Sequence, residues 1–193
     1  PIGDDGTALG LRNGVLPNNP LDTINDYETT QHTADFRWTF NEAKAAHVLA
    51  YIQLLNFVEG TVAGTPIRLS PWQGFLFINA FGWVANVDPE IRRYTEILVM
   101  VGRKNAKSTI LAALALYELQ YAPDGSQIVT MATQREQAKL VWNMSGRMAQ
   151  MSDKRLTQGL KRTVSTISNE GKWNRYEALS KESKRLDGLS IRL

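Results

Sequence analysis

The 193-residue sequence contains no cysteine and only two histidines, His32 and His47. Disulfide frameworks, cysteine-based zinc sites and histidine-rich metal sites are therefore excluded. Long apolar runs are also lacking, since none approaches the ~20 residues of a membrane-spanning helix. No basic segment followed by an apolar one opens the chain. We therefore expect a cytosolic protein with no membrane partner.

Acidic residues are scarce in the larger, C-terminal part of the chain. Residues 1–66 carry three basic and eight acidic side chains, a balance of −5, whereas residues 67–193 carry 19 basic and 11 acidic ones, a balance of +8. A basic surface favours a polyanionic partner, either a nucleotide or a nucleic acid. A solvated basic face without a partner is the alternative that charge alone leaves open.

Hydrophobic periodicity predicts four helices joined by short strands and turns. Apolar residues at helical spacing place these helices within 39–58, from Pro71 past Phe81, after Lys107-Ser108, and over 134–151. The apolar runs at 95–101 and 126–133 are typical of strands buried on both faces, and 86–93 and 122–125 are turns. Residues 1–35 are rich in Gly, Asn, Asp, Thr and Pro, which predicts an extended arm.

The order strand, helix, strand, helix predicts an α/β fold with a parallel sheet and crossover helices. We expect residues 1–66 to form an N-terminal arm and helical segment, and residues 67–193 to form the sheet-containing domain. Residues 152–193 are basic and less periodic, and the last four residues, SIRL, begin like a further strand.

The stretch VMVGRKNAKSTILAALALYEL, residues 99–119, reads as a strand, a cationic turn and a helix. A phosphate-binding loop needs inward N–H groups, a lysine for the β and γ phosphates, and a Ser or Thr for Mg²⁺. Lys107 and Ser108 meet the last two needs. In the usual pattern G-x-x-x-x-G-K-[ST], however, Gly102 is one place late and Ala106 replaces the second glycine. Alanine is tolerated if its φ is not positive and its methyl group does not crowd the phosphate.

A basic turn with no ligand is the alternative interpretation of this stretch. Arg103, Lys104 and Lys107 place three cations within five residues, and these would repel one another without an anion. A merely solvated Lys107 is disfavoured because a helix N-terminus repels cations. Arg103 suits the γ-phosphate because its guanidinium is planar, but it could instead form a salt bridge within the loop.

The altered loop resembles that of the large terminase subunit of tailed bacteriophages, the ATPase that drives DNA into an empty capsid. That family uses the form G-R-K-N-[GA]-K-[ST], which residues 102–108 match position for position. The family segment L-x-P-W-Q-x-F is also matched, by Leu69, Pro71, Trp72, Gln73 and Phe75. Residues 131–142 and 180–190 resemble two further family segments, so the resemblance covers roughly residues 36–193.

The resemblance implies a P-loop NTPase domain, incomplete over residues 67–193, with ATP and Mg²⁺ as cofactors. Lys107 and Arg103 are the expected catalytic residues, and Ser108 is expected to bind Mg²⁺ through the bound nucleotide. The expected nucleotide-binding residues are Gln73, Gly102, Arg103, Lys104, Asn105, Ala106, Lys107, Ser108 and Thr109. In the family the glutamine is associated with adenine recognition, and its amide offers one donor and one acceptor. An exposed helix glutamine is the alternative for Gln73.

The resemblance also implies partners in the host cell cytoplasm: double-stranded DNA, the capsid portal, the small terminase subunit and, in a ring, further copies of the same subunit. Lys161-Arg162 and Lys184-Arg185 would meet DNA phosphates or lie on a solvated face. We interpret Trp142 and Trp173 as packing residues, and Trp72 as a packing residue with base stacking as the alternative.

The next feature of the family, an apolar strand that ends in Asp-Glu, would follow Leu193. We therefore interpret the chain as an N-terminal part of such an ATPase, with a nuclease domain expected further on. We expect weak ATP binding and almost no hydrolysis, because the water-orienting carboxylate would lie after Leu193. Two rivals stay open: a helicase-like ATPase, and a basic DNA- or capsid-binding module whose loop is vestigial.

Overall fold

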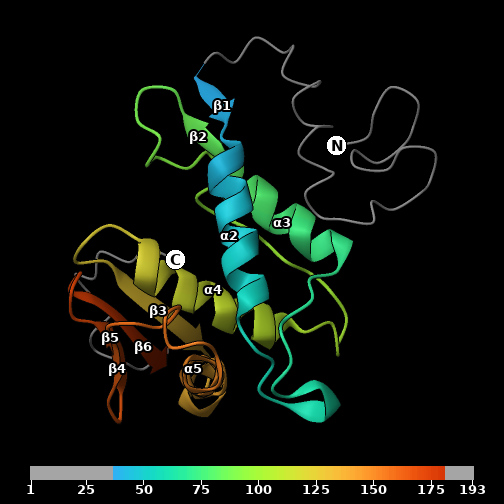
Figure 1. The fold of residues 1–193 in the computed structure, drawn as a ribbon, viewed down its shortest axis with the longest axis vertical. Coiled ribbons are helices and arrows are strands. Elements are labelled where there is room, and N and C mark those ends of the chain that lie inside the picture. The colour runs from blue at the N-terminus through green and yellow to red at the C-terminus, as the bar shows by residue number, and fades with distance from the viewer. Residues whose placement is uncertain (1–36, 181–193) are drawn as a thin grey trace. The chain divides into compact units, whose positions relative to one another are not determined.

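The computed structural model describes residues 37–180, which fall into two compact units (Figure 1). The described parts of the first unit are residues 37–50 and 68–99, and those of the second are 51–67 and 100–180. One crossing between the units follows Ile67, next to the boundary that the sequence predicts at residues 66–67. The others follow Ala50 and Val99, so the units interleave along the chain. The predicted domain division stays a prediction.

The first unit combines a two-stranded sheet with helices. Strand β1 (Trp38–Phe40) pairs antiparallel with β2 (Trp83–Ala85), with Phe40 opposite Trp83. Their rings meet edge to face at 5.4 Å. Gly82 permits this packing, since a Cβ there would clash with the Phe40 ring. The sequence did not predict these strands, because three residues are too few to show a period.

The first unit contains one whole helix and most of another, and both lie where the sequence predicts helices. Helix α2 (Glu42–Leu54) begins in this unit and its last turn belongs to the second unit. Helix α3 (Pro71–Gly82) starts with proline at its first position, where the missing N–H has no intrahelical partner to lose. The Ser70 N–H donates to Gln73 Oε1 at 2.9 Å, which closes the first turn.

The second unit packs two helices against one face of a mixed four-stranded sheet (Figure 1). In sheet order the strands are β3 (Gln127–Ala132), β6 (Asn174–Ser180), β5 (Thr166–Asn169) and β4 (Leu160–Arg162). Strands β3 and β6 pair in parallel, whereas β5 pairs antiparallel with both β6 and β4. The helices are α4 (Lys107–Tyr121) and α5 (Arg135–Met151), and a 3₁₀ turn, η1 (Gly60–Val62), belongs to the same unit. The predicted α/β class is confirmed.

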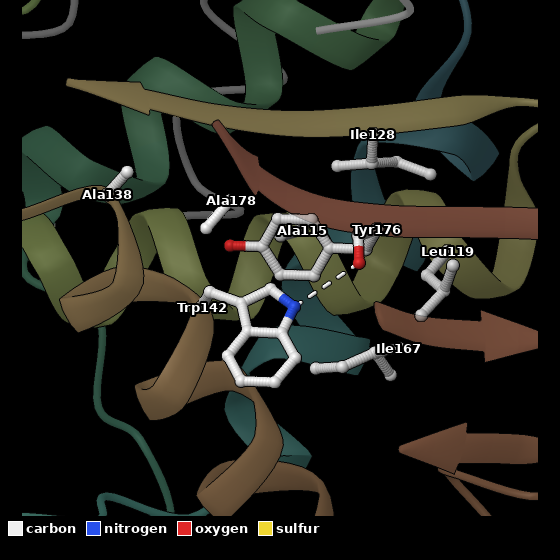
Figure 2. Close-up of a cluster of buried hydrophobic side chains, with 8 residues drawn as sticks. All are labelled: Ala115, Leu119, Ile128, Ala138, Trp142, Ile167, Tyr176 and Ala178. Atoms are coloured by element: carbon white, nitrogen blue, oxygen red, sulfur yellow. Dashed lines mark hydrogen bonds between the residues drawn. The ribbon is translucent and has the colours of Figure 1, made fainter. Parts of the chain in front are cut away.

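Figure 2 shows the core of the second unit, in which side chains of both helices meet the sheet. The Trp142 ring of α5 lies beside Tyr176 of β6, and its Nε1 donates to the Tyr176 carbonyl at 3.2 Å. The Tyr176 side chain makes a further contact, because its hydroxyl shares a 2.6 Å hydrogen bond with the Thr130 hydroxyl of β3. The packing role predicted for Trp142 is confirmed.

The strand predicted over 95–101 is wrong for the described part of the chain. Residues 95–101 form no strand there, and Leu98 and Met100 are 86% and 84% exposed. A short apolar run becomes a strand only when another strand supplies its hydrogen bonds. No described strand pairs with this run. Hydrophobicity alone therefore predicted a strand that is not formed among the described residues.

The packing role predicted for Trp173 is also wrong. Trp173 lies in the turn between β5 and β6, at φ +60°, and 76% of it is exposed. The two strands last pair at Asn169 and Asn174, so Trp173 lies in the turn beyond the last strand pair of the sheet. The arm predicted over 1–35, the C-terminal SIRL strand and Lys184-Arg185 lie outside the described residues.

Candidate nucleotide-binding site

The cationic loop joins directly onto the N-terminus of α4. Helix α4 begins at Lys107, and the preceding Ala106 has φ 54° and ψ 23°, in the left-handed region. Its carbonyl accepts the Ile110 N–H at 3.0 Å, the first bond of the helix. The condition that the sequence analysis set for alanine at this position is therefore not met. A side chain in this conformation costs roughly 1–2 kcal/mol, so the loop stores strain at its junction with the helix.

A second left-handed residue tightens the same loop. Lys104 has φ 66°, and the Asn105 side chain donates from Nδ2 toward the carbonyls of Gly102 (3.3 Å) and Arg103 (3.4 Å). A Cβ placed on Gly102 would meet Asn105 Nδ2 at 3.5 Å, an ordinary contact. The local turn thus depends on Asn105 and on two strained residues rather than on glycine.

Lys107 folds back over the loop that precedes it. Its Nζ donates to the carbonyl oxygens of Val101 at 2.6 Å and Gly102 at 2.8 Å. Hydrogen bonds from an ammonium group are shorter and stronger than neutral ones. Lys107 is therefore held by the loop rather than simply solvated, and its ammonium group closes the turn where phosphates would be expected.

The remaining predicted loop residues are at the surface. Arg103, Lys104 and Ser108 are exposed, and Thr109 is half-buried in the first turn of α4. No carboxylate among residues 37–180 pairs with Arg103, so the alternative of a salt bridge within the loop is not observed. The first N–H groups of any helix lack intrahelical acceptors, and here they follow two exposed cations.

Gln73 belongs to the first unit, whereas the loop belongs to the second. Gln73 is 6% exposed and its Oε1 accepts the Ser70 N–H, so the alternative of an exposed helix glutamine is wrong. Its neighbour Trp72 is half-buried. The adenine contact assigned to Gln73 stays a prediction, beside an observed role in starting α3.

The opposite end of α4 is fixed by side chains that the sequence did not single out. Asn174 is fully buried, and its Nδ2 lies 3.2 Å from the Leu119 carbonyl and 3.3 Å from that of Ala122. Asn169 donates to Gln120 Oε1 at 2.6 Å. The asparagines flank the β5–β6 turn, where a sequence pattern predicts turn residues rather than partners for a distant helix.

The basic pair Lys161-Arg162 on β4 is engaged within the protein. Lys161 pairs with Glu170 at 2.5 Å. The Arg162 guanidinium lies 4.6 Å from the centre of the Trp142 ring and donates to Asn143 Oδ1 at 2.7 Å. Neither contact tests the predicted meeting with DNA phosphates, but both give the pair a structural role.

The donor set of the loop fits a divalent cation that arrives with a nucleotide. Within residues 37–180 no group of three or more His, Cys, Asp or Glu side chains could hold a metal ion. The Ser108 hydroxyl offers a single hard oxygen ligand at the helix start. Mg²⁺ commonly combines one or two protein ligands with phosphate oxygens and water.

Comparison with known proteins settles the family. A profile described as the terminase large subunit, ATPase domain, matches residues 71–192, which include both Gln73 and the whole loop. The chain belongs to the terminase large subunit family. The large terminase subunit of Enterobacteria phage HK97 is 30% identical over 155 residues, covering 76% of this chain and 29% of that protein. The crystal structure of the HK97 large terminase matches with a TM-score of 0.63 and 27% identity, covering 77% and 29% of the two chains.

The terminase match confirms the resemblance that the loop and the Pro-Trp-Gln segment indicated. It also supports the α/β ATPase fold of the described residues. The chain spans less than a third of the length of the HK97 protein. None of the helices described over 37–180 is long and apolar enough to cross a membrane.

Proposed function

We propose that residues 102–109 of this terminase chain bind the phosphates of ATP, as part of a motor that packages DNA. The observation that carries the proposal is the pair of bonds from Lys107 Nζ to the Val101 and Gly102 carbonyls, at the start of a 15-residue helix. They hold an ammonium group over a strained loop at a positive helix end, an arrangement that suits an anion.

Each loop residue has a distinct proposed role in binding. Lys107 would exchange its carbonyl partners, wholly or in part, for oxygens of the β and γ phosphates. Arg103, exposed beside it, would contact the γ-phosphate with its planar fork of donors. The Ser108 hydroxyl would hold Mg²⁺, which when bound neutralises charge on the phosphoryl oxygens. The first N–H groups of α4 would orient the phosphate chain.

The residue that activates water for hydrolysis is not assigned within residues 37–180. The buried Glu118 lies eleven residues after Lys107, about 16 Å along the helix axis. Lys107, Arg103 and Ser108 would therefore bind and orient the nucleotide, and would stabilise charge that develops on it.

The partners of the motor are proposed from family membership. These are double-stranded DNA, the capsid portal, the small terminase subunit and further copies of the subunit in a ring, all in the host cell cytoplasm. The match to the terminase profile and to the HK97 large subunit supports this set.

Calorimetric titration of the 193-residue chain with Mg-ATP tests the nucleotide proposal. We expect a dissociation constant between micromolar and millimolar, about −8 to −4 kcal/mol. Circular dichroism on the same sample establishes that the protein is folded. Absence of binding heat at millimolar Mg-ATP, on folded protein, would instead favour a DNA- or capsid-binding module with a vestigial loop.

A further inference from the structure

Arg93, in the first unit, is held by aromatic rings rather than by carboxylates. Its guanidinium carbon lies 5.4 Å from the centre of the Trp83 ring and 5.6 Å from that of Tyr94. Its backbone N–H donates to the Trp83 carbonyl at 2.9 Å, which fixes the start of the side chain. The residue is exposed. An arginine in this position is oriented by its neighbours while it keeps its charge.

Arg162 provides a comparison within the same chain. Its guanidinium also lies over a ring, Trp142 at 4.6 Å, but one of its N–H groups is bound by Asn143 Oδ1 at 2.7 Å. Arg93 has no hydrogen-bond acceptor or ion-pair partner for its guanidinium among residues 37–180. Ring contacts occupy the face of a guanidinium and leave the donors in its plane free. Arg93 thus presents an unused fork of donors at the surface.

We propose that Arg93 contacts a backbone phosphate of double-stranded DNA. A phosphate matches the planar fork bidentately, and orientation by Trp83 and Tyr94 reduces the entropy lost when the contact forms. A surface arginine suits a DNA backbone, whose phosphates receive most protein contacts. A nucleotide, in contrast, usually binds in a concave pocket. The inference extends the proposed function by naming a residue for its DNA partner, and it requires nothing of the phosphate loop.

Salt dependence of DNA binding tests this role. On duplex DNA the logarithm of the binding constant falls linearly with the logarithm of the salt concentration, and each phosphate contact makes this negative slope steeper by about 0.9. We would titrate the 193-residue chain against a fluorescent duplex of about 30 base pairs, from roughly 50 to 200 mM salt. Arg93→Gln should make the slope shallower by about 0.9 and weaken binding about tenfold at the lower salt concentration. Arg93→Lys should keep the slope but lose part of the affinity, because it keeps the charge without the fork.

Arg155→Gln is the matched control. Arg155 is an exposed arginine of the second unit whose Nε and Nη2 groups donate to Asp153, the latter at 2.6 Å, so its charge is paired and one edge of its fork is occupied. We expect the Arg155→Gln slope to equal that of the wild type. Equal slopes for Arg93→Gln, Arg155→Gln and wild type would overturn the proposal, as would the absence of duplex binding by the wild type at about 50 mM salt.

A parallel Mg-ATP titration separates the two sources of phosphate. Arg93→Gln should bind Mg-ATP as the wild type does. A loss of ATP affinity with an unchanged DNA slope would assign Arg93 to the nucleotide and overturn the proposal. Lys107→Ala should leave the DNA slope unchanged. If the wild type binds no ATP and the Arg93 effect on the slope persists, the nucleotide proposal fails while this one stands.

Discussion

At the C-terminal end of α4, buried amides of Asn169 and Asn174 satisfy the helix, whereas at the N-terminal end a lysine and two left-handed residues close the loop. The amides at the C-terminal end are buried, and their acceptors include the backbone carbonyls of Leu119 and Ala122. The ammonium group of Lys107 bonds two carbonyls at the edge of the exposed loop, and in the proposed function it would exchange them for phosphate oxygens. We infer that one end of the helix provides stability and the other end provides function.

Asn174→Ala should produce the largest loss of stability at the C-terminal end. The side chain is fully buried, and it bonds the Leu119 and Ala122 carbonyls and accepts the Ser126 N–H at 2.8 Å. Removing it leaves buried groups unpaired, which costs about 3 kcal/mol of unfolding free energy. Urea unfolding should show this loss, while Gln150→Ala, at an exposed helix position, should change little. A loss below about 1 kcal/mol would mean that Asn174, beside the β5–β6 turn, does not hold the C-terminal end of α4.

Ala106→Val tests the strain at the N-terminal end. A β-branched residue tolerates the left-handed conformation worse than alanine, so we expect a loss of about 2 kcal/mol in unfolding free energy. Ala106→Gly removes the strain but makes the unfolded chain more flexible, so the two effects should offset each other to within about 1 kcal/mol. Thermal or urea unfolding of the pair measures the difference. Equal stabilities for the two variants would show that Ala106 does not adopt this conformation in solution.

Asp153→Asn should have the smallest effect. Asp153 lies just before the turn whose Leu156 and Gln158 carbonyls accept the Gln120 amide at the C-terminal end of α4. Hydrogen bonds from the Arg155 side chain and backbone lower the pKa of Asp153 to about 2. A lowered pKa contributes stability above the unfolded value of 3.8, and this contribution is lost as the pH falls toward 2.

The Asp153–Arg155 pair is exposed, so we expect wild type and Asp153→Asn to unfold at nearly the same urea concentration at pH 7. Any difference should shrink further as the pH falls from 4 toward 2. An Asp153→Asn effect as large as that of Asn174→Ala would show that a surface charge pair, rather than buried amides, holds the turn.

The sequence predicted the elements that show a periodic or continuous apolar pattern. It missed the elements that depend on contacts between residues far apart in the chain. Helices α3 and α5 and strand β3 lie where periodicity and the Pro71 signal place them. The strand predicted over 95–101 failed because its apolar residues say nothing about a pairing partner. Strands β5 and β6 were missed because their segments contain many polar residues and show no apolar run, and their pairing depends on the rest of the sheet.

The sequence predicted which residue types form the candidate site, but it predicted the geometry of the site only in part. Lys107 was predicted because it precedes Ser108 at a helix start and because residues 102–108 match the altered loop of the terminase family. The left-handed backbone of Ala106 could not be predicted, since alanine rarely adopts it. The role of Gln73 in starting α3 was also missed. A helix glutamine is normally exposed, whereas the Gln73 side chain folds back to accept the Ser70 N–H in a capping bond.

The measurement that tests the account most directly compares Mg-ATP affinity in Lys107→Ala and Lys104→Ala. Both changes remove one cation from the same loop, but only Lys107 bonds the Val101 and Gly102 carbonyls, while Lys104 is exposed on the turn. By calorimetry we expect Lys107→Ala to weaken binding about 100-fold or more and Lys104→Ala to weaken it by less than about fivefold. Equal losses in the two variants, or a larger loss in Lys104→Ala, would contradict the assignment of Lys107 as the phosphate-binding lysine.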